Sequence, residues 1–328
     1  MKRIHAALLA GATLPSLVLL GAALPAAADP GGRPDSYLLT GDAGGSKFEG
    51  IGADKRTGTF YVSEVTGGEI HRGTVRSSVT EEWLAGDGTD GRFTARGITV
   101  DRDGNVFIAG GPNGIDPALP GGLPHLWVYS RSGELLAALR VPGENVFLND
   151  VWIGPDGAAY FTNTNAPQIF RVAPGEDGYE AELWADATGV IPTLPGFNLG
   201  GIVTSPDRSA LIVAQGTTGQ LWRFDLADRS VTLVDTAGLN ADGLVNADGL
   251  VRRGTRLVVV RNFSRVVTTL RLAADGTSAR LVRERSTDPD RVLTTAKFLR
   301  GRILYVDSKF DETVAAPPYE VVTDPFVD

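Results

Sequence analysis

The sequence repeats a pattern of short β-strands with a nearly constant period, and this period constrains the fold more than any other feature. Each copy begins at an anchor residue before a short apolar run, and a turn and further runs of β-forming residues follow. The anchors are 47, 53, 51, 48 and 48 residues apart, at Glu49, Arg96, Asn149, Gly200, Asp248 and Ala296. One four-stranded sheet cannot bury both of its faces, whereas several such sheets packed around an axis can.

We therefore predict an all-β fold, a six-bladed β-propeller with four strands in each blade and no amphipathic helix. The sixth copy is one strand short, while Ser36–Thr40 forms a spare strand before the first copy. We predict that this N-terminal strand completes the sixth blade and closes the ring non-covalently. A pair of β-sandwiches is the alternative, but a sandwich does not require so regular a period.

The N-terminus has the pattern of a secretory signal peptide. A basic start is followed by the apolar stretch 6–24 and by three alanines that end at Ala28, which form an A-x-A cleavage site. The alternative is a membrane anchor, but prolines interrupt the apolar stretch and no stop-transfer pattern follows. We expect 1–28 to be removed near Ala28 and the mature protein to be secreted without a membrane anchor, with 29–35 as a linker and 36–328 as a single propeller domain.

Composition excludes several classes of function. The formal net charge is -8, which argues against nucleic acid as a partner because phosphate binding needs clustered Lys and Arg. The chain has no Cys, which excludes thiol catalysis, Cys-ligated zinc and haem attachment. Its three His residues do not cluster as a zinc site would require, and no G-x-S-x-G motif occurs. We expect a monomer that binds a small molecule.

Polar residues recur at the anchors, and in a propeller the innermost strands run along a central channel. The anchors and their neighbours should therefore meet at one mouth of the channel: Glu49, Arg96, Asn149, Asp150, Asn198, Asp248 and Lys297. Carboxylate and carboxamide oxygens favour a hard divalent cation such as Ca²⁺, Mg²⁺ or Mn²⁺. Arg96, Asp150 and Lys297 would bind the substrate, with the two cations facing an anionic or carbonyl group. Alternatively, these residues cap turns and line a wet channel without a function.

Four segments resemble the SMP-30/gluconolactonase/LRE family in their order and spacing: Phe48–Ile51, Leu148–Val151, Gly201–Asp207 and Ala247–Leu250. The resemblance spans nearly the whole mature chain. It implies a six-bladed propeller with one divalent metal in the central channel, and an enzyme that hydrolyses lactones. We expect the metal to be calcium, with magnesium, manganese or zinc as alternatives.

The resemblance also implies roles for individual residues. Glu49 and Asp248 would be carboxylate ligands of the metal, and Asn149 would lie beside the metal and face the substrate. The family's usual Asn ligand falls at Gly200, so Asn198 would serve as a ligand only if its loop shifts. The family often has an Arg where this chain has Phe147, which predicts an altered substrate site.

The Asp ligand of the fifth copy has two candidates, because Leu239–Leu244 is repeated almost unchanged as Val245–Leu250. The spacing to the sixth anchor favours Asp248, and Asp242 is expected in a turn.

These observations predict a secreted, metal-dependent hydrolase of lactones or related esters. The cation would polarise the ester carbonyl and lower the pKa of a bound water, Asp248 would take the proton of that water as general base, and Asn149 would orient the substrate. Two alternatives stay open: a non-catalytic propeller that binds a ligand or metal, and an enzyme similar to strictosidine synthase on the same scaffold.

Overall fold

The computed structural model describes residues 32–111, 122–239 and 243–327. The predicted signal peptide, 1–28, lies outside these residues. The described residues from Arg33 onward contain 24 strands and one short 3₁₀ turn, η1 (Thr89–Gly91). The strands form six separate four-stranded antiparallel sheets, so the predicted all-β, six-bladed propeller is confirmed.

The first three blades each use four consecutive strands. Blade one comprises β2 (Phe48–Asp54), β3 (Thr59–Glu64), β4 (Ile70–Thr74) and β5 (Glu81–Leu84). Blade two comprises β6 (Ala95–Val100), β7 (Val106–Gly110), β8 (Leu126–Tyr129) and β9 (Leu135–Leu139). Blade three comprises β10 (Leu148–Ile153), β11 (Ala159–Asn163), β12 (Gln168–Gly175) and β13 (Gly178–Asp186).

The next two blades repeat this arrangement, and the last one departs from it. Blade four comprises β14 (Leu199–Thr204), β15 (Ala210–Gln215), β16 (Gln220–Asp225) and β17 (Val231–Leu233). Blade five comprises β18 (Ala247–Arg253), β19 (Arg256–Arg261), β20 (Val266–Leu272) and β21 (Ala279–Ser286). Blade six comprises β22 (Leu293–Leu299), β23 (Arg302–Asp307), β24 (Tyr319–Val322) and β1 (Ser36–Leu39).

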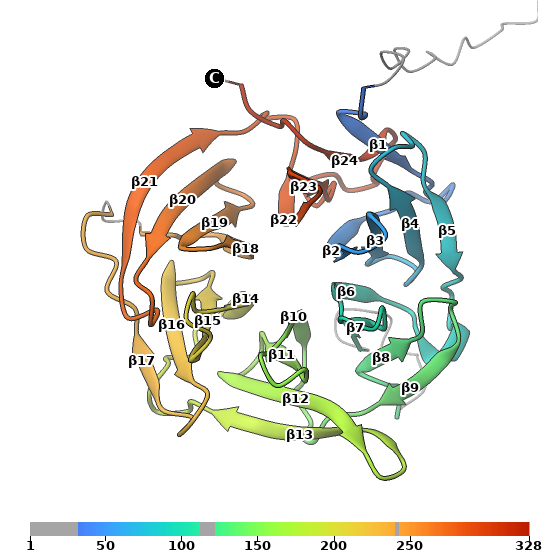
Figure 1. The fold of residues 1–328 in the computed structure, drawn as a ribbon. Helices are drawn as coiled ribbons and strands as arrows, with labels where there is room; N and C mark the ends of the chain where they lie inside the picture. Colours follow the sequence, from blue (N-terminus) through green and yellow to red (C-terminus); the bar gives the residue numbers. More distant parts are fainter. Residues whose placement is uncertain (1–31, 112–121, 240–242, 328) are drawn as a thin grey trace, which may run out of the picture. The chain divides into compact units, whose positions relative to one another are not determined.

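The sheets form a ring in which the first strand of each blade faces the centre (Figure 1). These innermost strands contact one another in the order β2, β6, β10, β14, β18, β22 and again β2. Hydrophobic side chains from adjacent blades pack between the sheets, which explains why the strands of the inner layers are apolar on both faces.

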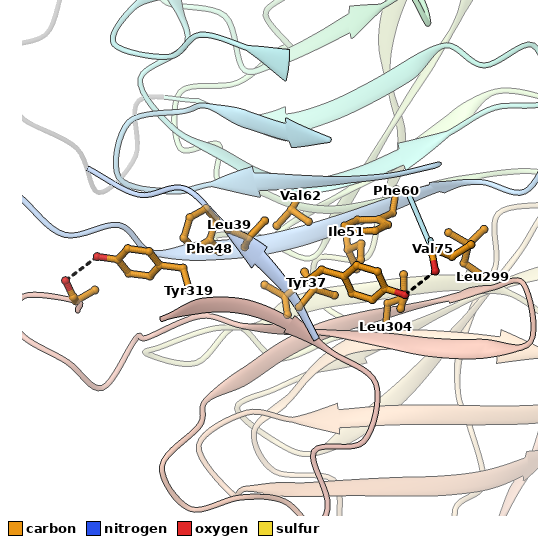
Figure 2. Packing of buried hydrophobic residues seen from close by; sticks show 13 residues of the cluster. Tyr37, Leu39, Phe48, Ile51, Phe60, Val62, Val75, Leu299, Leu304 and Tyr319 are labelled. Atoms are coloured by element: carbon orange, nitrogen blue, oxygen red, sulfur yellow. Dashed lines mark hydrogen bonds between the residues drawn. The ribbon is translucent and has the colours of Figure 1, made fainter. Parts of the chain in front are cut away.

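The N-terminal strand closes the ring, as the sequence predicted. β1 pairs antiparallel with β24, with Tyr37 opposite Val321. Figure 2 shows the core cluster at this junction, where the Tyr37 ring meets Phe60 edge-on at a centroid distance of 5.0 Å. The Tyr37 hydroxyl donates a hydrogen bond of 3.3 Å to the carbonyl of Val75 in the first blade. The strand therefore joins the two ends of the ring by both backbone pairing and packing.

Replacement of Tyr37 should test this closure. We expect Tyr37→Ala to lower the free energy of unfolding by about 3–5 kcal/mol, because the side chain is fully buried. Tyr37→Phe removes only the hydroxyl and should cost about 1 kcal/mol. Urea titrations followed by tryptophan fluorescence would measure both values. Equal, small effects of the two substitutions would contradict the closing role of this strand.

Candidate metal and substrate site

A β-bulge interrupts the pairing of every innermost strand at the same place. The breaks in register fall between Phe48 and Ile51, Ala95 and Ile98, Leu148 and Val151, Leu199 and Ile202, Ala247 and Leu250, and Leu293 and Ala296. A bulge bends the strand and redirects side chains. The first bulge residues are Glu49, Arg96, Asn149, Gly200, Asp248 and Thr294, so five of the six predicted anchors lie at equivalent positions and the sixth lies two residues too far along the chain.

The second bulge residue is glycine in four blades because the next blade approaches too closely for a side chain. A Cβ atom on Gly50 would lie 2.2 Å from the carbonyl oxygen of Arg96, and one on Gly201 would lie 2.2 Å from that of Asp248. Gly97 and Gly249 are equally crowded by the next innermost strand. Each glycine thus permits the next innermost strand to approach closely, and this approach sets the position of the bulge residue on that strand.

Hydroxyl groups compensate for backbone pairing that the bulges disrupt. The Asp150 N–H donates to Thr162 Oγ1 at 3.1 Å, and the same hydroxyl donates to the Gly200 carbonyl of the next blade at 2.8 Å. The Thr294 hydroxyl likewise donates to the Glu49 carbonyl across the junction of the sixth and first blades at 2.8 Å. These bonds hold successive bulges at a defined spacing around the ring.

A cavity of about 620 Å³ lies at the bulged ends of the innermost strands. Its lining includes Glu49, Arg96, Asn149, Gly200 and Asp248, together with residues of the connecting loops. With Asn198, which also lines the cavity, the structure therefore brings together five of the predicted polar site residues.

Two carboxyl groups line this cavity, of which Glu49 is buried and Asp248 is partly buried. Burial raises the pKa of Glu49 well above its ordinary value, and the negative charge of Asp248 raises it further, although Arg96 acts in the opposite direction. Burial also raises the pKa of Asp248 to about 7, against the effect of a 2.9 Å hydrogen bond from Asn262. Two neighbouring carboxyl groups that disfavour each other's charge would be stabilised as carboxylates by a bound cation.

The chemistry and space of the cavity fit a hard cation. A Cβ atom on Gly200 would lie 3.7 Å from Asn149 Oδ1 and 3.9 Å from Asp248 Oδ1, so the region beside these oxygens has room for a further ligand. Glu49, Asn149 and Asp248 offer only oxygen donors to a metal, and the described residues of the cavity lining include no His. This donor set favours Ca²⁺, Mg²⁺ or Mn²⁺ over Zn²⁺.

Asn198 lines the cavity, but its carboxamide holds the loop that precedes β14. The Oδ1 atom accepts hydrogen bonds from the Leu194 N–H at 2.9 Å and from Gln215 Nε2 at 3.2 Å. The Nδ2 group donates to the carbonyls of Leu194 and Thr164. A role as metal ligand would require these bonds to break, so the expected shift of this loop would have a substantial cost.

The predicted substrate-binding residues divide into three environments. Arg96 lies in the cavity with its guanidinium carbon 3.9 Å from the centroid of the Phe147 ring. Burial lowers the pKa of Arg96 to about 10, and Glu49 opposes that shift. Asp150 instead accepts backbone hydrogen bonds from Val151 at 2.8 Å and from Ile202 of the next blade at 3.3 Å. Its carboxylate thus braces two adjacent innermost strands.

Lys297 lies toward the opposite end of the innermost strands. It lines a second cavity of about 200 Å³, and its Nζ atom is 5.2 Å from the centroid of the Trp152 ring. The register explains this position, because Thr294 occupies the anchor position in blade six and Lys297 follows three residues later. The structure therefore does not bring Lys297 into the large cavity.

Sequence reasoning missed several cavity residues because they lie in loops outside the repeated motif. Asn262 binds Asp248 from the turn after β19. Phe263 and Phe310 line the same cavity from loops after second strands. Their only sequence signal is an aromatic residue in a polar loop, which does not by itself indicate a site. Asp242, the alternative to Asp248, lies outside the described residues.

A separate group of acidic side chains is not among the described residues that line the large cavity. Carboxylate oxygens of Asp42, Glu64 and Glu69 lie within 4.8 Å of one another, and burial raises the pKa of Glu69 to about 7. This acidic cluster lies near the turn between β3 and β4 and provides a second place where a cation could bind.

Comparisons with known proteins agree with the fold. A sequence model described as the SMP-30/gluconolactonase/LRE-like region matches residues 48–252. No protein with a curated description matches the chain. Within the described residues, no helix has the length and apolar character needed to span a membrane.

Solved structures with this fold come from several organisms. A gluconolactonase from Xanthomonas campestris is 18% identical with a TM-score of 0.58, over 86% of this chain and 87% of that one. The calcium-binding protein regucalcin from Agrobacterium tumefaciens is 17% identical with a TM-score of 0.57, over 86% and 94%. The major allergen Mala s 1 of Malassezia sympodialis is 16% identical with a TM-score of 0.64, over 89% and 96%. At these identities the likeness concerns the fold alone.

Adjacent glycines of one bulge offer a matched test of the packing. We expect Gly201→Ala to destabilise the protein by about 2 kcal/mol or more, because the new Cβ would meet backbone of the next blade at 2.2 Å. Gly200→Ala should cost about 1 kcal/mol or less, because its Cβ has ordinary contacts. Neither glycine has a left-handed backbone, so the contrast is steric. Thermal unfolding would measure it, and equal stabilities would refute the close-approach argument.

Proposed function

The chain belongs to the SMP-30/gluconolactonase/LRE-like family, and on this basis we propose that it is a secreted, metal-dependent hydrolase of lactones or related esters. The observation that supports this most is the pair of carboxyl groups with raised pKa values, the buried Glu49 and the partly buried Asp248, beside Asn149 in one large cavity. Secretion rests on the signal-peptide pattern of 1–28, which stays a prediction.

Three side chains would hold the cation: Glu49 and Asp248 through carboxylate oxygens, and Asn149 through its carboxamide oxygen. Calcium is our first choice, because it accepts oxygen ligands in flexible geometry. A bound cation would supply Lewis-acid polarisation of an ester carbonyl and a water molecule of lowered pKa.

The chain's own residues would carry the proton transfers and the orientation. Asp248 would accept a proton from the water that attacks the carbonyl carbon, and would return it to the ring oxygen as the C–O bond breaks to give a hydroxy acid. Asn262 holds the Asp248 carboxylate in place through its 2.9 Å hydrogen bond. Asn149 would orient the ester, and Arg96 would add positive charge to the wall of the cavity.

A non-catalytic propeller that binds a ligand or metal is the second candidate. It is favoured by the bulge of blade four, where Gly200 contributes no ligand and the Asn198 carboxamide is engaged in the loop. Fewer protein ligands imply weaker or incomplete metal coordination. A turnover assay can distinguish a propeller that only binds the metal from one that also catalyses hydrolysis.

Loss of either of these carboxylates should abolish metal-dependent activity. We expect Glu49→Gln and Asp248→Asn each to lower lactone hydrolysis by about 100-fold or more, since even residues that only support metal ligands contribute factors of about 10–100. The assay would use the mature protein with added Ca²⁺, Mn²⁺ or Zn²⁺, together with metal analysis of each variant.

Glu69→Gln is the matched control, because Glu69 is also a buried acidic residue that could take up a cation. It should leave hydrolysis nearly unchanged. Activity that survives in both Glu49→Gln and Asp248→Asn would rule out the proposed site, whereas metal binding without turnover in the parent protein would favour the binding propeller.

Supplying the absent ligand should strengthen metal binding. Gly200→Asn would project a carboxamide toward Asn149 Oδ1 and Asp248 Oδ1, and we expect it to raise the affinity for Ca²⁺ by about tenfold or more. Gly200→Ala adds bulk without a donor and should not raise the affinity. Isothermal titration calorimetry measures both. An unchanged affinity in Gly200→Asn, with the fold intact, would argue that the cation does not bind beside Gly200.

A further inference from the structure

Four phenylalanines line the large cavity from four different loops: Phe147, Phe197, Phe263 and Phe310. We call this set the phenylalanine collar. Phe197 is 64% exposed and Phe263 is 46% exposed. Single exposed apolar residues are common on proteins, but several around one cavity mark a place where apolar ligand surface is covered.

Hydrogen bonds hold the backbone of each collar residue. The N–H groups of Phe147, Phe263 and Phe310 donate to Asn163 Oδ1, Asn262 Oδ1 and Ser308 Oγ, respectively. The Phe197 carbonyl accepts a bond from the Thr217 hydroxyl. The collar is thus positioned before a ligand arrives, which reduces the entropy lost on binding.

Three carboxamide groups of the cavity lining already have partners within the protein, whereas the buried Thr94 hydroxyl has no hydrogen-bond partner among the described residues. Asn198 holds its own loop, Asn246 donates to Ser264 Oγ at 3.0 Å, and Asn262 donates to Asp248. A polyhydroxylated ligand would need such groups for its own hydroxyls, because buried hydroxyls without partners are costly. The acidic groups of the lining, Glu49 and Asp248, are confined to the bulge residues.

The cavity therefore has a polar, charged region at the bulges and an apolar surface at the loops. Its volume of about 620 Å³ lies within the range that holds a drug-sized ligand. We infer that the substrate is an amphipathic ester or lactone, whose reactive ring lies at Glu49, Asn149 and Asp248 while a hydrocarbon arm covers the phenylalanine collar. The placement of the reactive ring rests on the proposed function, whereas the binding of the arm does not.

A series of lactones tests this inference in the full mature protein. We expect kcat/KM to rise from γ-octalactone to γ-dodecalactone by about tenfold or more, since each fully buried methylene contributes a factor of about four. The hydrophilic D-glucono-δ-lactone should be the poorest substrate. The corresponding γ-lactams, which resist hydrolysis, should show the same order of affinity by isothermal titration calorimetry.

Variants test whether the phenylalanine collar causes the dependence of kcat/KM on chain length. Phe197→Ser combined with Phe263→Ser should remove most of the chain-length dependence, and both positions are exposed enough for the fold to tolerate the change. Leu233→Ser is the matched control, because Leu233 is a 51% exposed apolar residue on the outer strand β17. It should leave the dependence intact.

The two readouts separate this inference from the proposed function. Lactam affinity that rises with chain length, without hydrolysis of any lactone, would support the collar and refute the hydrolase. Hydrolysis that ignores chain length, or that favours D-glucono-δ-lactone, would overturn the collar and leave the hydrolase standing. If lactam affinity is independent of chain length and no lactone is hydrolysed, both are refuted.

Discussion

The close approach of neighbouring innermost strands is the constraint on which the rest of the structure depends. Six sheets must meet around one axis, and at the bulges their backbones come so near that a single methyl group at Gly50 or Gly201 would overlap the next strand. The bulge that permits this approach also redirects the side chain of the residue just before each glycine. Packing and site placement therefore have one physical cause, and the glycines belong to the site although they offer it no functional group.

The placement of two carboxyl groups in one cavity has an electrostatic cost that the fold by itself does not remove. Glu49 is buried and Asp248 is partly buried near it, and the loss of solvation makes the ionised form of each carboxyl unfavourable, as their raised pKa values indicate. Burial raises the pKa of Asp150 as well, but the positive charge of Lys297 and backbone N–H groups of two blades favour its carboxylate. A buried carboxyl without such bonds costs stability unless a proton or a cation accompanies it. Carboxyl groups that the fold leaves uncompensated in this way are expected in a binding site.

The fold and part of the site could be predicted from the sequence because both are periodic. The regular spacing indicated six blades, and the spare strand at Ser36 indicated the closure through β1. The anchors Glu49, Arg96, Asn149 and Asp248 follow the same period and lie in one cavity. The predicted anchor of blade six was two residues too far along the chain, so the prediction wrongly placed Lys297 in that cavity. The reason is that alternation along a strand does not reveal where a bulge shifts the register.

The sequence by itself determined the architecture, the order of the blades and the identity of the acidic anchors, since these depend on local patterns that recur along the chain. Only the tertiary structure decided which side chains share a cavity and which are engaged elsewhere. It committed Asn198 to its loop, placed Gly200 beside oxygens of Asn149 and Asp248, and brought phenylalanines from four loops together. The reason is that loop contacts join residues far apart in sequence, and no local pattern encodes their distances.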